Sequence, residues 1–313
     1  MKVLVIGGSG FIGSFLLKEL EKEDHEIFRL EEYFFKTLGE LKTHQNHLQL
    51  GNISDALSMK RVFRNVQPDI VIHLAAMTAV AYSYDRPLET TRTNYIGTVT
   101  IAETLRDECP DLKQFIYPSS AEVYGVNKIP LKREIDPLLP NSPYAVSKRA
   151  TEDYLNYMRL AFDFPVTIFR PFNTYGRTDS HWFIVEKLIY QMLTSDVVEV
   201  GDPDPIRDFL YVPNHIEAYL KAIDNKTAIG ETFNLSTGRG VTIRELAEII
   251  AKLTRFKGEI KWGTMPKRDL DIIHLVGDNT KIKSILKIST PISLEEGLKL
   301  TVQKWRKIVK RRR

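Results

Sequence analysis

The chain has little cysteine and no long apolar run. Cys109 is the single cysteine among 313 residues, which excludes an intrachain disulfide and a zinc site made of several cysteines. We expect no metal. No apolar stretch approaches the ~18 residues that a membrane-spanning helix needs, so we expect no membrane partner. The opening residues MKVLVIGG also lack the apolar core and cleavage site of a signal peptide, which predicts a cytoplasmic protein.

Positive charge is scarce outside the C-terminus. The formal net charge is +4, and the last ten residues, KWRKIVKRRR, carry seven basic side chains and no acidic one. The rest of the chain therefore has a net charge of 4 − 7 = −3, which argues against a nucleic-acid partner. The basic tail could touch a phosphate-rich partner. We expect instead a solvated helix end, where cations suit the negative pole of the helix dipole.

Short apolar runs alternate with amphipathic stretches in the first half of the chain. The runs predict strands at residues 2–6, 25–30, 48–53, 69–76, 115–120 and 166–171. The stretches predict helices at residues 15–23, 57–65, 98–108 and 147–161. This alternation is typical of an α/β fold with a Rossmann-type, doubly wound parallel sheet. We expect residues 1–170 to form that domain and residues 171–313 mainly a smaller α/β substrate-binding lobe, with 207–235 returning to the first domain.

The sequence GGSGFIG (7–13) lies between the first strand and the first helix. Glycines there allow a tight turn and close approach of backbone to a pyrophosphate, and the helix N-terminus supplies free N–H groups. A glycine-rich strand–turn–helix at this position indicates a dinucleotide site. We therefore place five residues of the turn in the cofactor site: Gly7, Gly10, Phe11, Ile12 and Gly13.

An acidic residue follows the second strand. Glu31 could accept hydrogen bonds from the adenosine ribose and repel a 2′-phosphate, which favours NAD over NADP. Arg29 could serve NADP, or could pair with Glu31, since both lie on one face of a regular strand. We expect NAD. Five further residues at the ends of the third and fourth strands are expected near the cofactor: Asn52, Ile53, Leu74, Ala75 and Ala76.

The segment SPYAVSKRATEDY (142–154) places Tyr144 and Lys148 four residues apart on one helix face. A tyrosine with a pKa near 10 is a poor base at neutral pH. A nearby ammonium and an oxidised nicotinamide would lower that pKa and make the phenolate accessible. Ser120, at the end of a strand, could bond to the same substrate hydroxyl. The pattern indicates oxidation of an alcohol.

With these motifs the chain resembles the extended short-chain dehydrogenases, specifically the NAD-dependent nucleotide-sugar epimerases and dehydratases. The resemblance covers nearly the whole chain and rests on GGSGFIG, HLAA (73–76), TNYIGT (93–98), SSAEVYG (119–125), SPYAVSK (142–148), RPFNTYG (170–176), RDFLYV (207–212) and SLEEGLKLT (293–301). It implies that Tyr144 deprotonates the sugar 4-hydroxyl, that Ser120 shares this hydrogen bond, and that Lys148 holds the nicotinamide ribose. Hydride transfer from C4 to NAD would give a 4-keto sugar.

The resemblance also implies further contacts. It places Asn94, Ser119 and Pro171 near the cofactor. It assigns four residues to the nucleotide-diphosphate sugar: Ser83, Asn173, Arg207 and Arg268. Arginine forks suit diphosphate oxygens. The alternatives are an ion pair with Asp208 for Arg207, and a solvated loop charge for Arg268.

Several positions depart from the family pattern. Pro118 replaces a third small polar residue, and Asn214 stands where aspartate is usual. KRDLDI (267–272) lacks the proline that normally follows the arginine. RPFNTYGRTDSHWF (170–183) omits the usual continuation rich in glycine and proline, so the wall over the sugar cannot be predicted.

The second chemical step depends on Glu122. In dehydratases and decarboxylases of the family, a glutamate stands two residues after the catalytic Ser or Thr, and Glu122 matches it as a base for C5. A loop carboxylate with a structural role is the alternative. Ala121 replaces the aspartate that serves as the acid in one dehydratase branch. We place a 4-epimerase first and a 4,6-dehydratase second, ahead of a decarboxylase, a 4-keto-sugar reductase and an NAD-binding sensor without turnover.

Two helices with apolar faces, around 97–108 and 145–162, match those that pair in dimers of the family. The resemblance thus implies a homodimer held by a four-helix bundle. Burial within one chain is the alternative.

Overall fold

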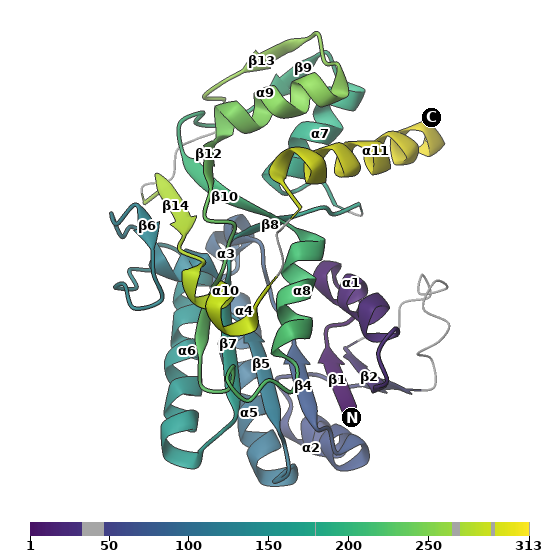
Figure 1. The fold of residues 1–313 in the computed structure, drawn as a ribbon, viewed down its shortest axis with the longest axis vertical. Helices are drawn as coiled ribbons and strands as arrows, with labels where there is room; N and C mark the ends of the chain where they lie inside the picture. The colour runs from purple at the N-terminus through teal and green to yellow at the C-terminus, as the bar shows by residue number, and fades with distance from the viewer. Residues whose placement is uncertain (33–46, 179, 265–269, 289–291, 313) are drawn as a thin grey trace.

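The computed structural model describes residues 1–32, 47–178, 180–264, 270–288 and 292–312 (Figure 1). Its main feature is a seven-stranded sheet in which every neighbouring pair is parallel. In spatial order the strands are β11 (Thr232–Leu235), β7 (Val166–Pro171), β5 (Gln114–Pro118), β4 (Ile70–His73), β1 (Lys2–Ile6), β2 (Glu26–Glu31) and β3 (Leu48–Leu50). The strand order reverses between β1 and β4, and open α/β sheets bind ligands at that crevice.

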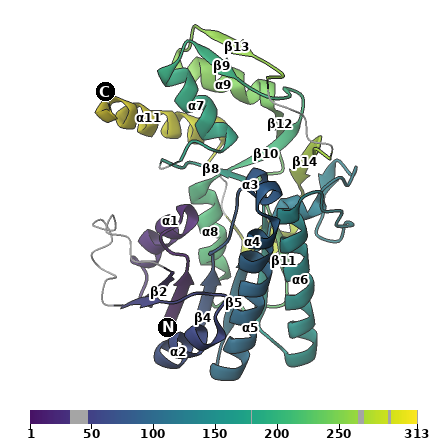
Figure 2. The same ribbon diagram turned by 180° about the vertical axis from the view of Figure 1, so that it is seen from behind.

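Helices cover both faces of this sheet (Figures 1 and 2). One face packs against α1 (Phe11–Leu20), α8 (Val212–Ala222) and α10 (Thr280–Leu286). The other packs against α2 (Ala56–Val66), α5 (Gly97–Glu108) and α6 (Pro143–Phe162). Side chains of β1 alternate accordingly, with Val3 and Val5 in one core and Leu4 and Ile6 in the other. The predicted doubly wound Rossmann-type sheet is confirmed.

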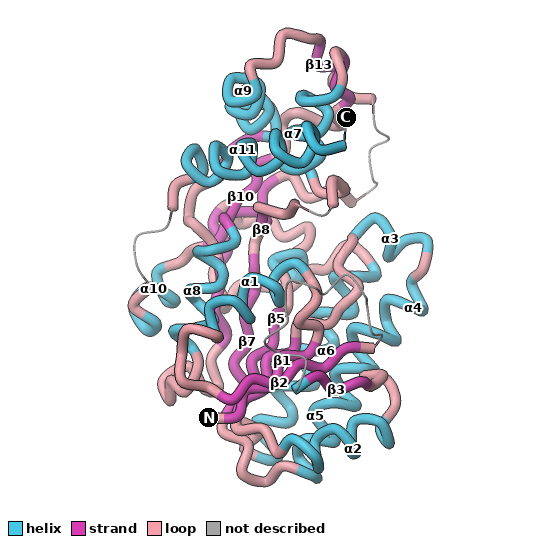
Figure 3. Tube along the Cα trace, turned by 90° about the vertical axis from the view of Figure 1, so that its right-hand side faces the viewer, coloured by secondary structure: helices cyan, strands magenta, loops and turns pink. Residues whose placement is uncertain are grey.

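A smaller lobe lies above the carboxyl ends of the large sheet (Figures 1 and 3). Its strands are β8 (Asn173–Tyr175), β9 (Val197–Glu199), β10 (Ile206–Tyr211), β12 (Gly240–Thr242), β13 (Glu259–Lys261) and β14 (His274–Gly277), joined at one edge by β6 (Leu131–Lys132). Its helices are α7 (Ile184–Thr194), α9 (Ile243–Thr254) and α11 (Leu294–Arg312). Between β10 and β12 the chain passes through α8 and β11, which pack on and join the large sheet.

Four short helical segments occupy the carboxyl end of the large sheet. They are α3 (Val80–Asp85), α4 (Pro87–Thr91), the π-helix η2 (Arg92–Ile96) and the 3₁₀-helix η3 (Ala121–Tyr124). None of the described helices is long and apolar enough to cross a membrane.

Three predicted strands end earlier than expected, which corrects their boundaries. Those over 48–53, 69–76 and 115–120 end at Leu50, His73 and Pro118. After β4 the N–H groups of Leu74 and Ala75 both donate to the Ile6 carbonyl, at 2.8 and 3.0 Å, so the chain has left the regular ladder. After β4 the apolar residues Leu74, Ala75 and Ala76 continue the strand pattern in the sequence although the backbone has already left the ladder.

Candidate active site

The glycine turn is closely packed except at Gly10. Gly7 has φ +83°, and a Cβ there would lie 2.7 Å from the Ala75 nitrogen. At Gly13 a Cβ would lie 2.5 Å from the Gly7 carbonyl oxygen, so α1 sits directly against the turn. A Cβ at Gly10 would meet only that oxygen, at 3.4 Å, and no side chain caps the N-terminus of α1 there. The turn leaves an open, N–H-rich surface, which fits a pyrophosphate.

Glu31 lies beside this turn as the last residue of β2. Its two carboxylate oxygens accept hydrogen bonds from the Ser9 N–H and the Ser9 hydroxyl, each at 2.7 Å. Burial raises the pKa of Glu31, and the Ser9 hydrogen bonds and Arg29 lower it. Arg29 Nε lies 3.6 Å from Glu31 Oε1, and its side chain is only 1% exposed. Arg29 thus takes the ion-pairing role, whereas each Glu31 oxygen keeps a lone pair for a further donor.

The residues expected near the adenine and the nicotinamide follow their strands directly. The Asn52 side chain is exposed, donates to Glu32 Oε1 at 3.0 Å and accepts from the Ser54 N–H at 2.8 Å. Ile53 packs against the backbone of Gly97, where an added Cβ would meet its Cδ1 at 2.8 Å. Ala76, like Leu74 and Ala75, is half-buried in the loop after β4. Small side chains leave the backbone accessible along this edge.

Ser120 and Tyr144 come together at the end of β5. Ser120 is the N-cap of η3, and its Oγ accepts from the Glu122 N–H at 3.2 Å. Tyr144 lies in the first turn of α6, which begins at Pro143 behind the N-cap Ser142. Burial raises the pKa of Tyr144 to about 12, a hydrogen bond with Ser120 lowers it, and the charge of Glu122 raises it. The two hydroxyls can therefore act on one substrate oxygen.

Lys148 extends along α6 one turn beyond Tyr144. Its Nζ donates to the Pro118 carbonyl at 2.8 Å and lies 4.7 Å from the centre of the Tyr117 ring. Burial lowers the pKa of Lys148 to about 7, and Glu152 raises it. Its Nζ is therefore held at the carboxyl end of β5.

Glu122 lies in η3, between Ser120 and the buried Val123, and its side chain is half-buried. Its charge raises the pKa of Tyr144, which places the carboxylate in the electrostatic range of the phenol. Ala121, the neighbouring residue, is 1% exposed and has no proton to donate. One carboxylate therefore stands near the Ser120–Tyr144 pair, and the adjacent position carries no second acid.

Asn94, Ser119 and Pro171 line the same edge of the sheet. The Asn94 amide bonds to both the N–H and the carbonyl of Met77, at 2.8 and 3.0 Å, and fixes the loop after β4. Ser119 is 4% exposed, and its Oγ has no hydrogen-bond partner among the described residues. Pro171 ends β7 opposite Leu235. The unpartnered Ser119 hydroxyl fits a bound polar group at this edge, because buried polar atoms are normally paired.

The predicted substrate contacts lie mainly in the smaller lobe. Asn173 pairs with Phe209 of the neighbouring strand β10, and its Nδ2 donates to the Asp208 carbonyl at 3.2 Å. Arg207 Nη1 donates to the Ile206 carbonyl at 3.0 Å. Ser83 is 1% exposed, and its hydroxyl donates to the Val80 carbonyl at 2.7 Å, within α3. Arg268 lies outside the described residues.

The alternative partner proposed for Arg207 is engaged elsewhere. Both carboxylate oxygens of Asp208 accept hydrogen bonds from the turn after β11, from the N–H groups of Thr237 and Gly238, each at 2.9 Å, and from the Thr237 hydroxyl at 2.6 Å. Burial raises the pKa of Asp208 to about 6, against these hydrogen bonds. Asp208 thus fastens β10 to that turn.

Sequence reasoning missed an ion pair behind the catalytic helix. Glu152 lies one turn beyond Lys148 on the same face of α6, and Arg170 Nη2 contacts its Oε2 at 2.6 Å. Arg170 Nη1 also donates to the Tyr124 hydroxyl at 3.0 Å. This buried pair joins α6 to β7 and places a negative charge near Lys148. The i, i+4 spacing of Tyr144, Lys148 and Glu152 could have placed Glu152 on the same helix face, but it does not identify Arg170 as the partner.

Asn214 explains one departure from the family pattern. Its Nδ2 donates to the Ile292 carbonyl at 3.0 Å, and its Oδ1 accepts from the Ile292 N–H at 2.9 Å. A carboxylate could make only the second bond. The amide therefore fixes the chain just before α11.

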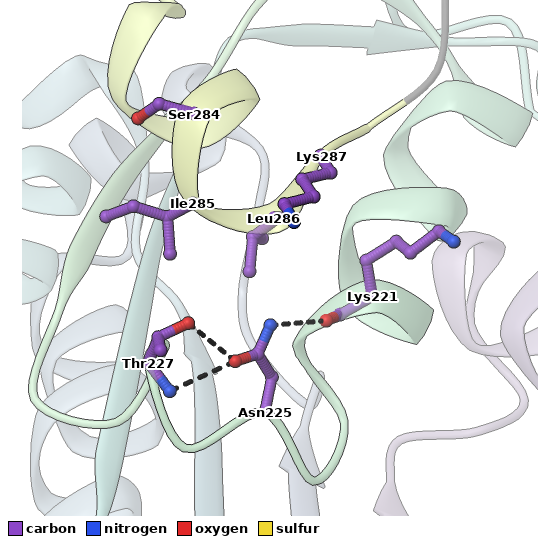
Figure 4. Close-up of a pocket in the computed structure, with 7 residues that line it drawn as sticks. All are labelled: Lys221, Asn225, Thr227, Ser284, Ile285, Leu286 and Lys287. Carbon is purple, nitrogen blue, oxygen red and sulfur yellow. Dashed lines mark hydrogen bonds between the residues drawn. The ribbon is translucent and has the colours of Figure 1, made fainter.

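A separate open cavity of about 630 Å³ lies between the C-terminal ends of α8 and α10 (Figure 4). Asn225 crosses its floor, donating to the Lys221 carbonyl and accepting from Thr227. None of the predicted site residues lines this cavity. Within the described part of the chain, no cluster of three or more His, Cys, Asp or Glu side chains could hold a metal ion.

Comparison with known proteins identifies the family to which the chain belongs. The family described as GDP-mannose 4,6 dehydratase matches residues 4–301. The chain belongs to this family. Its relatives are NAD-dependent nucleotide-sugar epimerases and dehydratases, so the chain is an enzyme of that class, and its cofactor is NAD.

Three relatives illustrate the range of reactions. The UDP-glucose 4-epimerase of Thermus thermophilus, solved with NAD, superposes with a TM-score of 0.87 at 26% identity over 98% of this chain and 99% of its own. A UDP-N-acetyl-alpha-D-glucosaminuronate decarboxylase of Bacillus cytotoxicus is 32% identical over 98% of both chains. A dTDP-D-glucose 4,6-dehydratase of Mus musculus is 30% identical over 98% of this chain and 89% of its own. Similar identities accompany three different reactions.

Proposed function

We propose that the enzyme oxidises C4 of a nucleotide-diphosphate sugar and acts as a 4-epimerase, with UDP-glucose and UDP-galactose as the type of substrate. The observation that carries the proposal is the meeting of Ser120 and Tyr144 at the end of β5, where Ser120 lowers the pKa of the phenol, with Lys148 Nζ held at the Pro118 carbonyl at 2.8 Å. A proton acceptor, a hydroxyl donor and a cation thus meet beside the glycine turn. Each is nine-tenths buried or more.

The residues present fit NAD. In the proposal, the open surface at Gly10 and the N-terminus of α1 hold the pyrophosphate, Glu31 accepts from the adenosine ribose, and Lys148 bonds to the nicotinamide ribose. Bound NAD⁺ supplies the hydride acceptor. Tyr144 removes the proton from the 4-hydroxyl while Ser120 holds the same oxygen. The phenol needs additional positive charge to work near neutral pH, because burial holds the pKa of Tyr144 at about 12.

After C4 is oxidised, epimerisation can be completed by the residues already assigned to the first step, Ser120 and Tyr144. It requires the 4-keto sugar to turn over and accept the hydride on its other face, with Tyr144 returning the proton. It needs no further acid or base. Loss of water from C6 needs an acid as well as a base, and Ala121 stands where one dehydratase branch has that acid, so Glu122 would have to serve as both. This supports the epimerase.

A 4,6-dehydratase is the second candidate, and Glu122 is the observation that favours it. Its carboxylate acts on the phenol of Tyr144 and is therefore near the reacting sugar. A base near C5 could remove the proton that the 4-ketone makes acidic, and the same carboxyl group could then donate it to the leaving hydroxyl.

In the same proposal residues 1–170 hold the dinucleotide, and residues 171–313 hold most of the nucleotide sugar. Arg207 and Asn173 lie on neighbouring strands of the smaller lobe, where they could meet the diphosphate. A guanidinium fork suits its oxygens.

Product mass decides between the second steps. The purified protein is incubated with UDP-, GDP- and dTDP-sugars, and the products are analysed by mass and by sugar composition. The epimerase gives unchanged mass and a new stereoisomer. Loss of water identifies the dehydratase, and loss of CO₂ from a glucuronate identifies a decarboxylase. If no sugar is converted although NAD is bound, the protein is a sensor and the proposal fails.

We further propose a homodimer formed through α5 and α6, which lie side by side on one face (Figure 2). Large apolar side chains on and next to these helices are exposed: Ile96 by 45%, Val146 by 53% and Tyr157 by 51%. Light scattering of the purified protein should give twice the chain mass, and Tyr157→Glu should give the monomer. A monomeric wild type would overturn this assignment.

A further inference from the structure

Arg177 joins the two halves of the molecule at the edge of the cofactor site. It follows β8 in the segment that departs from the family pattern. Its guanidinium carbon lies 4.2 Å from the ring centre of Phe11 and 3.7 Å from that of Phe183. Phe11 is the first residue of α1 after the glycine turn, and Phe183 is the N-cap of α7. One cation therefore contacts a ring from each half.

The position of Arg177 is set by the smaller lobe. Its backbone N–H donates to Glu186 Oε1 at 3.0 Å, and its carbonyl accepts from Trp305 Nε1 at 2.9 Å. Nη1 donates to the Thr174 carbonyl at 2.6 Å. Glu186 is fully buried and also accepts from the Gly176 N–H at 2.8 Å. Contacts from β8, α7 and α11 hold the arginine in the smaller lobe. Its contact with Phe11 on α1 is the one that reaches the other half of the molecule.

Phe11 is a sensitive point for cofactor binding. Its own N–H belongs to the uncapped first turn of α1, where the dinucleotide pyrophosphate is expected. A guanidinium stacked on the ring restrains this turn and adds positive charge beside it. We propose that Arg177 is a positioning residue that fastens the glycine turn to the smaller lobe and thereby slows release of the bound dinucleotide.

The rate of NAD dissociation tests this proposal without any sugar, so its outcome is independent of which reaction the enzyme catalyses. Arg177→Met keeps an unbranched, flexible side chain and removes the planar cation. We expect NAD to leave Arg177→Met more than tenfold faster than wild type, with an intermediate rate for Arg177→Lys. The matched control is Arg244→Met, which removes an exposed arginine stacked on Trp262 at 5.0 Å in the smaller lobe and should leave the rate unchanged.

A double-mutant cycle with Phe11→Leu separates the stack from a general loss of fold. Phe11→Leu should release NAD faster by a similar factor, and Arg177→Met combined with it should be no faster than the faster single variant. The proposal would be overturned if NAD left Arg177→Met at the wild-type rate. It would also be overturned if the rate increases of the two single variants multiplied in the double variant. If Arg177→Met fails to fold, as thermal unfolding of the NAD-free protein would show, Phe11→Leu decides alone, and a wild-type rate there overturns the proposal.

Discussion

The two sides of the crevice present different atoms to a ligand, mainly backbone on one side and side chains on the other. The dinucleotide side consists of backbone: the turn from Gly7 to Gly13 is packed so closely that an added Cβ at either end would strike main-chain atoms. The facing lobe reaches the crevice with long side chains, among them Arg177. Backbone contacts suit a cofactor common to many enzymes, because they do not depend on side-chain identity. Side-chain contacts can change while the fold is kept, which suits the part of the site that selects a sugar.

The largest effect is expected at Tyr144. Its side chain lies on the dinucleotide side of the crevice but must act on the substrate. Tyr144→Phe should lower turnover by about 10³-fold, because the proton acceptor is lost, while NAD stays bound. Turnover and the content of bound NAD are measured on the same preparation. The matched control is Tyr154→Phe, which removes a hydroxyl farther along α6 that donates to Glu103. Turnover equal to wild type in Tyr144→Phe would remove this residue from the mechanism.

Acid should destabilise the fold through two buried histidines. Burial lowers the pKa values of His73 in β4 and His215 in α8 to about 3. Below the ordinary pKa of 6.5 the unfolded chain takes up protons that the folded chain does not, so stability falls as the pH falls. Between pH 7.5 and 5 each histidine lowers the free energy of unfolding by about 2 kcal/mol.

Asp208 opposes this change, because its folded pKa of about 6 lies above the ordinary value and its contribution grows on acidification. Between pH 7.5 and 5, Asp208 raises the free energy of unfolding by about 1.4 kcal/mol. With the two histidines lowering it by about 2 kcal/mol each, the net loss of stability is roughly 3 kcal/mol. Urea unfolding at both pH values measures the difference. Equal stability at pH 7.5 and 5 would mean that the histidines are not held neutral.

Two glycine substitutions should separate packing from cofactor binding on the backbone-built side. Gly13→Ala drives a Cβ into the Gly7 carbonyl and should cost about 1–3 kcal/mol of folding free energy. Gly10→Ala has room in the protein itself and should fold normally but bind NAD more weakly, because the Cβ occupies the surface that faces the pyrophosphate. Thermal unfolding and NAD titration test the pair. Equal stability of the two variants would contradict the packing described for the turn.

The smallest effect is expected at Asn214, which joins α8 to the segment before α11. Asn214→Asp restores the residue usual in the family but removes the donor to the Ile292 carbonyl. Loss of one hydrogen bond should lower stability by about 1 kcal/mol. The unfolding midpoint measures it, with Asn225→Asp at the remote cavity as a comparison, since that amide also donates to a carbonyl. A more stable Asn214→Asp variant would show that the amide is not what fixes this segment.

The large sheet and the catalytic helix were predictable because their signals are local. Apolar runs marked six of the seven strands, all but β11, and the spacing of Tyr144 and Lys148 placed both on one helix face. The strand ends at Leu50, His73 and Pro118 were not, since they depend on where the sheet ladder stops and not on a change in the local sequence pattern. The contacts of Arg177 with Phe11 and of Glu152 with Arg170 join segments far apart in the sequence, and no local pattern encodes such pairs.

The direction of the Lys148 side chain illustrates the same limit. The spacing brought Tyr144 and Lys148 to one face, but the direction of the ammonium depends on the Pro118 carbonyl, which belongs to another element. Tertiary contacts decide what a helix face does.

Reduction of the bound cofactor tests the central claim most directly. Wild-type protein carrying NAD⁺ is mixed with each nucleotide sugar, and the absorbance of the reduced nicotinamide is followed through a single turnover, with Tyr144→Phe loaded to the same level beside it. The account predicts that at least one nucleotide sugar produces transient reduced cofactor in wild type and none does so in Tyr144→Phe. Equal reduction in both proteins, or conversion of a sugar with no reduced cofactor at any time, would contradict it.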